Sequence, residues 1–142
     1  MPAVPAELIA AVAVAGLLGC FLGSFLNVCI HRLPRNESVV HPPSRCYACG
    51  TRVAWYDNLP VIAYLLLRGR CRWCGSPFSP RYLVLEVVTG ILTAATAWWV
   101  LSGHVLWPEP WQRGVALAAL LPLIWLFIVS SVIDLEHMII TR

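Results

Sequence analysis

Three long apolar stretches are separated by two polar segments along this chain. The apolar stretches are residues 8–30, 82–101 and 114–133, and the polar segments between them are residues 31–81 and 102–113. Each apolar stretch has about 20 residues or more, the length that an α-helix needs to cross a hydrocarbon core roughly 30 Å thick. The pattern therefore predicts an all-α integral membrane protein with three transmembrane helices.

Composition and the chain ends agree with this prediction. Of the 142 residues, 59% are hydrophobic and only 12% are charged, a balance unlike that of a soluble domain. Residues 1–7 contain no basic residue, which argues against a cleaved secretory signal. Three spans then place the N-terminus outside and residues 134–142 inside. Tryptophans gather around the predicted outer loop, as in an interfacial aromatic belt: Trp98, Trp99, Trp107 and Trp111.

Positive charge is concentrated in the first polar segment. Residues 31–81 carry eight of the ten basic residues, all arginine, against only Glu37 and Asp57. Such an excess in a short loop between spans marks the cytoplasmic side. Four of these arginines are placed to meet anionic lipid head groups: Arg68, Arg70, Arg72 and Arg81. We expect no nucleic-acid partner, because both ends of the segment are tethered to the bilayer.

Two CxxC motifs lie in the same segment. Cys46-Tyr-Ala-Cys49 and Cys71-Arg-Trp-Cys74 are separated by twenty-one residues. Two such motifs supply four thiolates to one tetrahedral zinc ion, and four protein ligands leave no position for water, so this zinc would stabilise the fold rather than catalyse. Two disulfides or a redox-active thiol pair are the alternatives. A reducing cytoplasm disfavours disulfides and therefore favours zinc.

Two glycines follow the CxxC motifs, and two further cysteines lie in the first apolar stretch. Gly50 and Gly75 directly follow the two motifs, where the chain must turn tightly with positive φ. Cys20 and Cys29 lie in an apolar run, and we interpret them as ordinary buried small hydrophobes.

Small and polar residues share helix faces in two of the spans. Gly19, Gly23 and Asn27 follow one another at four-residue spacing in the first span. Small residues permit close helix approach, and an amide in hydrocarbon requires an interhelical partner. GxxxG also occurs by chance in glycine-rich spans, so a packing role stays open. In the second span, Glu86 is followed at helical spacing by Thr89, Gly90, Thr93 and Ala97, so one face of this helix is small and polar. Such a face is predicted to lie inside the helix bundle.

A short helix is predicted between the two cysteine motifs. Asp57-Asn58-Leu59-Pro60 has the pattern of a helix cap with proline in the first turn, and Gly69 is placed to end the helix. Residues 59–68 are strongly apolar but too short to span a bilayer. We expect them to pack on the cysteine motifs or to lie in the membrane interface.

Asp134 follows directly after the third span. A carboxylate near a helix C-terminus opposes the macrodipole, and aspartate is costly close to hydrocarbon. Composition alone favours the simpler interpretation, in which Asp134 and Glu136 mark the exit from the membrane.

Several ordered motifs together resemble the bacterial type IV prepilin peptidases. Gly23-Ser-Phe-Leu-Asn-Val28, continuing Cys29-Ile-His-Arg-Leu-Pro34, is similar to the opening signature of that family, and the four cysteines match its tetracysteine loop. The remaining matches are Trp55-Tyr-Asp-Asn-Leu-Pro60, Leu67-Arg-Gly-Arg-Cys71, Ser79-Pro-Arg-Tyr82 with Glu86 and Thr89-Gly90, and Ile133-Asp134-Leu135. The resemblance covers about Gly19 to Ile140, and it reverses the interpretation of Asp134.

This resemblance implies a membrane aspartic endopeptidase of the bacterial inner membrane. Its members cut the basic leader from prepilins or pseudopilins at the cytoplasmic face, and many N-methylate the new N-terminus with S-adenosylmethionine. Asp134 corresponds to the first catalytic aspartate; in such a pair, one ionised aspartate activates water and a protonated partner polarises the scissile carbonyl. We assign the arginines to topology and lipid contact, and Glu37, Asp57 and Glu86 to contact with the leader.

Two departures from the family pattern limit this expectation. Six residues after the first aspartate the family has Pro-Asp, whereas this chain has Thr141-Arg142. The family's second catalytic aspartate lies in a later Gly-x-Gly-Asp-type motif that this sequence does not contain. Glu86 is a poor substitute, because it lies near the base of another span. We therefore expect an amino-terminal half that is inactive alone, whether as a fragment, a truncated product or one half of a split enzyme.

Two other function classes compete with the peptidase. A zinc-stapled scaffold would bind a leader or a partner subunit without catalysis. A membrane thiol oxidoreductase would need redox-active CxxC pairs rather than metal-bound ones.

Overall fold

The structure, a computed structural model, describes residues 4–103 and 109–140, with side chains as far as Glu136. Predictions for Trp107 and for residues 141–142 lie outside the described residues. Three long helices dominate: α1 (Ala6–Arg32), α3 (Arg81–Leu101) and α4 (Pro110–Ile140). All three are long and apolar enough to cross a membrane, so the predicted three-span, all-α architecture is confirmed.

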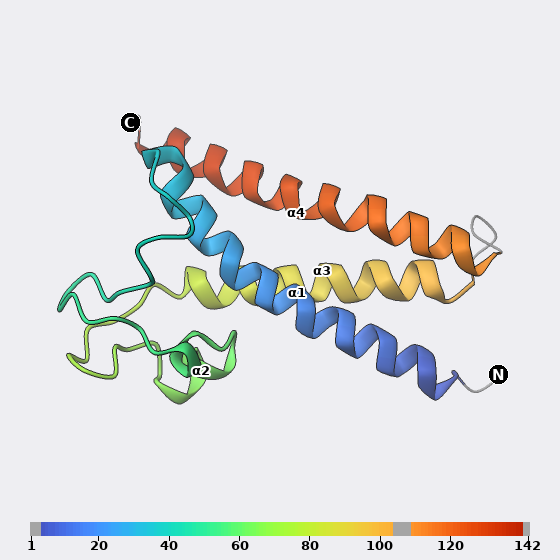
Figure 1. The fold of residues 1–142 in the computed structure, drawn as a ribbon, viewed down its shortest axis with the longest axis horizontal. Helices are drawn as coiled ribbons and strands as arrows, with labels where there is room; N and C mark the ends of the chain where they lie inside the picture. Colours follow the sequence, from blue (N-terminus) through green and yellow to red (C-terminus); the bar gives the residue numbers. More distant parts are fainter. Residues whose placement is uncertain (1–3, 104–108, 141–142) are drawn as a thin grey trace.

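The helices run side by side, and the polar segment folds at one end of them (Figure 1). We call residues 33–80 the cysteine module. The last turn of α1, the first turn of α3 and the last turns of α4 lie at this end, whereas the first turn of α1 lies at the opposite end (Figure 1). We refer to the end that carries the cysteine module as the module end.

The helices extend beyond the apolar stretches that predict them. α1 begins two residues before and ends two residues after residues 8–30, and α4 exceeds residues 114–133 at both ends. Hydropathy marks only the part of a helix that crosses hydrocarbon, whereas backbone hydrogen bonding continues into the interface. Pro110 is the first residue of α4, a position where proline is favourable because its missing N–H would have no partner.

Glycines allow α1 and α3 to approach closely. A Cβ atom at Gly23 would lie 2.8 Å from Glu86 Cα, and one at Gly19 would lie 2.7 Å from Thr93 Cβ and 2.9 Å from Gly90 Cα. All three distances are too short for a Cβ atom at either position. The packing role of the GxxxG pair, which the sequence left open, is therefore confirmed.

Polar groups on the same interface are mostly satisfied. Asn27 is 2% exposed, and its Nδ2 donates to Gly23 O at 3.3 Å and across to Tyr82 O on α3 at 3.2 Å. The predicted interhelical partner of this amide is therefore a backbone carbonyl. On α3 the threonine hydroxyls return to the helix itself, Thr89 to Leu85 O at 2.7 Å and Thr93 to Thr89 O at 2.8 Å.

The third helix completes the bundle. The buried core joins all three long helices through Leu26 and Ile30, Leu85, and Ile128. Trp125 Nε1 of α4 lies 3.2 Å from Thr93 Oγ1 of α3 and donates to it. The face of α3 that was expected inside the bundle is indeed buried: Leu85, Glu86, Thr89, Gly90, Thr93, Ala97 and Val100.

The cysteine module has little regular structure. It contains two short 3-10 helices, η1 (Leu33–Arg35) and η2 (Trp55–Asn58), and one short α-helix, α2 (Ile62–Leu66). Arg32, the last residue of α1, holds the start of the module by donating to Ser38 O and Pro42 O, both at 2.8 Å.

The helix predicted to start with the Asp57 cap begins later. Val61 has φ 62°, a left-handed conformation that is strained for a β-branched residue, and α2 starts only after it. Asp57 therefore does not cap α2; it binds an arginine instead, as described below. Gly69 closes the turn after α2 as expected, with φ 65° and its N–H donating to Tyr64 O at 2.9 Å.

Candidate metal centre and adjoining cavity

Four cysteine sulfurs from the two CxxC motifs converge in the cysteine module. The Sγ atoms of Cys46, Cys49, Cys71 and Cys74 all lie within 4.8 Å of one another. Cys46 and Cys71 are buried, whereas Cys49 and Cys74 are exposed. All are free thiols, and the Cys46 and Cys74 sulfurs are 3.8 Å apart, far beyond the roughly 2.0 Å of a disulfide bond. The cluster is therefore suited to hold a metal ion.

The two motifs fold in the same way. In the first, Gly50 N–H donates to Cys46 O at 2.8 Å, and Cys46 N–H donates to Thr51 O at 2.9 Å. The second repeats both bonds: Gly75 N–H to Cys71 O at 3.0 Å, and Cys71 N–H to Ser76 O at 2.8 Å. Gly50 and Gly75 have φ 71° and 68°, as their position after each motif predicted.

Each turn is closed by a single antiparallel bridge, Arg45 with Arg52 and Arg70 with Pro77. Two equivalent turns thus point four thiols at one place, and their backbone groups are already hydrogen-bonded.

The metal-free thiols hold their protons unequally. Hydrogen bonding with the Thr51 side chain, followed by hydrogen bonding with its backbone, lowers the pKa of Cys49 to about 6. The Ser76 N–H acts to lower the pKa of Cys74, but desolvation and hydrogen bonds with the other three sulfurs outweigh it and raise that pKa to about 11. A metal ion must therefore displace protons as it binds, which makes its affinity depend on pH.

An ion pair holds the segment between the motifs against the second motif. Both carboxylate oxygens of Asp57 accept from Arg72 Nε, at 3.1 and 2.9 Å, and Oδ1 also accepts from Arg72 Nη2 at 2.5 Å. The Arg72 guanidinium also lies over the Tyr56 ring, 5.5 Å from its centroid. Hydrogen bonding by Arg72 holds the pKa of Asp57 below its ordinary value.

Glu86 joins the cysteine module to α3. It is only 7% exposed, and its Oε2 accepts the backbone N–H of Val61 at 2.7 Å. This is the residue with the left-handed conformation just before α2. The carboxyl group therefore satisfies a backbone donor that no helix or strand satisfies, and it fixes the depth of α2 beside α3.

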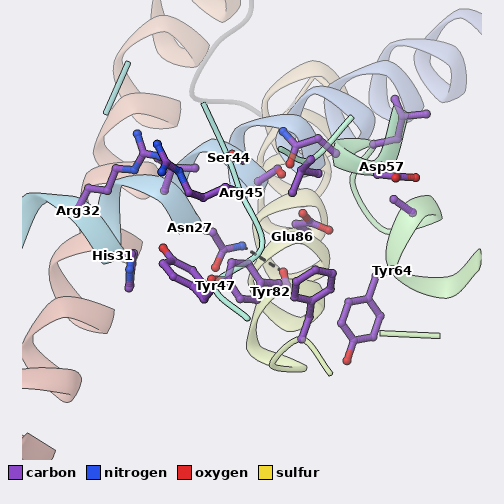
Figure 2. A pocket seen from close by; sticks show the side chains of 17 residues that line it. Asn27, His31, Arg32, Ser44, Arg45, Tyr47, Asp57, Tyr64, Tyr82 and Glu86 are labelled. Atoms are coloured by element: carbon purple, nitrogen blue, oxygen red, sulfur yellow. Dashed lines mark hydrogen bonds between the residues drawn. The ribbon is translucent and has the colours of Figure 1, made fainter. Parts of the chain in front are cut away.

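A cavity of about 160 Å³ lies between α1, α3 and the cysteine module (Figure 2). Asn27, Tyr82 and Glu86 form its floor on the two helices, and Arg45 and Asp57 contribute from the module. The structure therefore brings together the two carboxyl residues expected to contact a leader, Asp57 and Glu86, although each already has a partner.

Asp134 lies elsewhere. It is exposed on α4 and does not line this cavity. Two residues further along, Glu136 pairs with Arg81 at the start of α3, which holds this part of α4 at the module end. Glu37, the third acidic residue expected to face a leader, is exposed just after η1.

Three contributions were not expected from the sequence. They are the hydrogen bonds from Arg32 to backbone carbonyls of the cysteine module, the hydrogen bond from Trp125 to Thr93 between two spans, and the hydrogen bond from Val61 N–H to Glu86. Arg32 and Glu86 had a signal in the sequence, because both lie in family-like motifs, but neither motif indicated the partner.

This geometry defines a class of protein: a multi-pass helical membrane protein with a four-cysteine module between its first two spans. Residues 17–100 match the family described as the bacterial peptidase A24 N-terminal domain. The chain belongs to this prepilin peptidase family, of which it carries the amino-terminal part.

Several similar proteins bear the same name. A prepilin leader peptidase/N-methyltransferase of Klebsiella pneumoniae is 39% identical over 84% of this chain and 50% of its own length. A protein of the same name from Pseudomonas aeruginosa is 32% identical over 87% of this chain and 47% of its own length. Another, from Myxococcus xanthus, is 53% identical over 54% of this chain and 23% of its own length. The chain thus spans about half the length of most of these relatives. No solved structure matches it.

Proposed function

We propose that this chain is the amino-terminal half of a membrane aspartic endopeptidase that removes the leader from type IV prepilin-like proteins at the cytoplasmic face of the bacterial inner membrane. The observation that carries this proposal is the similarity to prepilin leader peptidase/N-methyltransferases over more than four-fifths of the chain. Orientation with the N-terminus outside follows from the arginine excess of the polar segment.

Asp134 is proposed as one catalytic carboxylate. It emerges at the module end of α4, beside the Glu136–Arg81 pair, where a substrate held at the membrane surface would reach it. An aspartic mechanism needs two carboxyl groups, one to take a proton from water and one to donate a hydrogen bond to the scissile carbonyl. Residues 1–142 contain only one other aspartate, Asp57, which is held by Arg72 in the module. The second catalytic aspartate is therefore expected from a further segment.

The metal in the cysteine module is proposed to be a structural zinc ion. Zinc–sulfur bonds of about 2.3 Å in a tetrahedron separate two sulfurs by about 3.8 Å. The Cys46–Cys74 separation of 3.8 Å equals that value. Cys46, Cys49, Cys71 and Cys74 would fill all four positions, so the ion would hold the two motifs together and take no part in catalysis.

The apolar face of α2 is proposed to lie in the membrane interface. Ile62, Leu65 and Leu66 are 56%, 61% and 76% exposed, although the Glu86–Val61 bond places the start of α2 beside the second turn of a membrane-spanning helix. Arg68 and Arg70 follow at once, as expected for contact with anionic head groups. Membrane lipid is thus the proposed partner of this face.

Leader contact by Asp57 and Glu86 is a weaker proposal than a structural role for both. Asp57 is bound by Arg72 and Glu86 by Val61 N–H, whereas Glu37 is exposed.

The relatives' name also includes N-methyltransferase, so we propose that the complete protein methylates the new N-terminus. S-adenosylmethionine would supply the methyl group and leave as S-adenosylhomocysteine, and the α-amine would lose a proton.

The test is cleavage of a prepilin by this chain co-expressed with the carboxyl-terminal half of a related enzyme. We expect cleavage by the pair, none by this chain alone, and a loss of at least about a hundredfold with Asp134→Asn, which removes one member of a catalytic pair. Glu109→Gln, which changes an acidic residue next to the other end of α4, is the matched control and should cleave normally.

Cleavage that survives Asp134→Asn would remove Asp134 from the mechanism, and cleavage by the isolated chain would overturn the half-enzyme proposal. A pair that never cleaves, although both halves are folded and membrane-inserted, would favour the competing zinc-stapled scaffold or partner-binding half.

A further inference from the structure

Two acidic residues of α4 lie on opposite sides of the helix at the module end. Glu136 continues the side of α4 that packs on the buried core. The partly buried residues of that side precede Glu136 at helical spacing: Val129, Val132 and Ile133. Asp134 comes two residues before Glu136, which is about 200° around a helix of 3.6 residues per turn. Asp134 is accordingly exposed, on the side turned away from the core.

The exposed side of α4 is as apolar as the packed side. Leu123 and Phe127 precede Asp134 by eleven and seven residues, so they share its face of the helix, and they are 62% and 73% exposed. Lipid tails are as apolar as these side chains, so the burial of apolar surface does not favour one rotation of α4 over another in a membrane. Directional polar contacts are therefore needed to fix the rotation.

Two polar contacts with α3 hold the observed rotation. In the middle of α4, Trp125 Nε1 donates to Thr93 Oγ1 at 3.2 Å. At the module end, Glu136 forms its ion pair with Arg81, the first residue of α3. Trp125 and Glu136 are eleven residues apart, so both lie on the packed side of α4. The ion pair is the contact nearer to Asp134, and it determines which way that carboxyl group faces.

Arg81 and Glu136 depend on each other. Their side chains are only 38% and 29% exposed. Apart from this ion pair, Arg81 Nε and Glu136 Oε1 are buried without a hydrogen-bond partner among the described residues. Removing one member of such a pair leaves the other charge uncompensated, which costs more than losing the attraction itself. Arg81 is also held on its own helix, because its backbone N–H donates to Ser79 Oγ at 3.3 Å.

We infer that Arg81 is a positioning residue for Asp134: its ion pair with Glu136 fixes the rotation of this part of α4 and keeps the Asp134 carboxyl on the face turned away from α1 and α3. The inference rests on the proposed function, in which Asp134 is one carboxylate of a catalytic pair. It adds that the second carboxyl approaches from this outer face of α4. Reacting groups need to be held within roughly 10–20° of the productive orientation, so a looser helix lowers turnover.

The first test measures the rotation of α4 and does not depend on cleavage. Asp134→Cys and Ile133→Cys are made separately in a chain that also carries Cys20→Ala and Cys29→Ala, so that the remaining cysteines are bound to zinc. Each protein is labelled with a water-soluble maleimide in lipid nanodiscs. We expect Asp134→Cys to react at least about tenfold faster than Ile133→Cys, because Ile133 packs on the core and reacts only when the helix opens.

Substitutions of the ion pair should change this ratio of labelling rates. Arg81→Gln should reduce the ratio at least about threefold, because the helix then opens and rotates more readily. The charge swap Arg81→Glu with Glu136→Arg should restore the ratio, as should the conservative Arg81→Lys. Arg52→Gln, which removes an exposed arginine of the cysteine module, is the matched control and should leave the ratio unchanged. Equal zinc content in all variants checks that each cysteine module is folded.

The second test is the cleavage assay with the carboxyl-terminal half of a related enzyme. Arg81→Gln should lower kcat at least about tenfold, because small displacements of a reacting group are costly, while KM stays within about twofold. The charge swap should restore kcat.

A labelling ratio that Arg81→Gln leaves unchanged, or that the charge swap fails to restore, would overturn the inference. An unchanged kcat in Arg81→Gln would overturn it as well. The two proposals fail separately, because labelling needs no cleavage: a pair of halves that does not cleave refutes the peptidase proposal, whereas an unchanged labelling ratio refutes this inference even where the pair cleaves.

Discussion

The close approach of α1 to the backbone of α3 at Gly23 predicts the effect of a single added methyl group. In Gly23→Ala, the new Cβ would lie 2.8 Å from Glu86 Cα and 3.1 Å from Leu85 O. Both are backbone atoms, so no change of rotamer relieves the clash. Ordinary contact begins at 3.4 Å, which requires α1 and α3 to separate by roughly 0.6 Å. A gap of that size forfeits about a quarter to a half of each affected contact, and overpacking typically costs about 1–3 kcal/mol.

Gly114→Ala is the matched control for this substitution. Gly114 lies in α4 and a Cβ there meets nothing within 4 Å, so only helix propensity changes, which favours alanine by up to about 1 kcal/mol. The two substitutions are therefore expected to change the free energy of unfolding in opposite directions. The measurement is SDS-driven unfolding in mixed micelles, followed by tryptophan fluorescence. A Gly23→Ala protein as stable as the wild type would refute the close packing of α1 on α3.

Three further substitutions test other contacts. Cys46→Ser should reduce bound zinc from one ion per chain to a small fraction and raise the protease sensitivity of the cysteine module, because structural zinc contributes folding energy directly; an unchanged digestion pattern after metal removal would contradict this. Asp57→Asn should lower the free energy of unfolding by about 0.2–1 kcal/mol at pH 7. Arg72 lowers the pKa of Asp57 in the folded state, so the stabilisation by this ion pair is fully present above the unfolded pKa of about 4. The stabilisation is lost as pH falls through the folded pKa. A stability difference between Asp57→Asn and the wild type that persists at pH 2 would contradict this reasoning. Trp125→Phe removes the bond to Thr93 and should cost about 0.6 kcal/mol in the same SDS titration, and no change would show that the bond is not formed in lipid.

Residues with a strong local signal were predicted correctly from the sequence. The three spans follow from apolar length alone, and the positive φ of Gly50 and Gly75 follows from the CxxC turn. The convergence of the four cysteines also follows from spacing, because each motif folds locally. The need of Asn27 for an interhelical partner was predictable, since hydrocarbon offers none.

Contacts that depend on tertiary placement were not predictable. Asp57 has the sequence of a helix cap, but Arg72 lies fifteen residues away and its charge-assisted bonds take the carboxylate. The bond from Val61 N–H to Glu86 was not predictable, because no local pattern indicated the strained conformation of Val61. The cavity is formed by two helix ends and a loop, so no single stretch of sequence reveals it.

We propose that the cysteine module and Asp134 face the cytoplasm, where thiols stay reduced. The most direct test of this proposal is a pair of reporter fusions, after Ser38 in the module and after Ser102 at the other end of α3, each made with alkaline phosphatase and with a green fluorescent protein. Alkaline phosphatase needs disulfides and so works only outside the cytoplasm. We expect fluorescence without phosphatase activity for the fusion at Ser38, and phosphatase activity without fluorescence for the fusion at Ser102. Active phosphatase at Ser38 would contradict both the zinc assignment and the peptidase assignment.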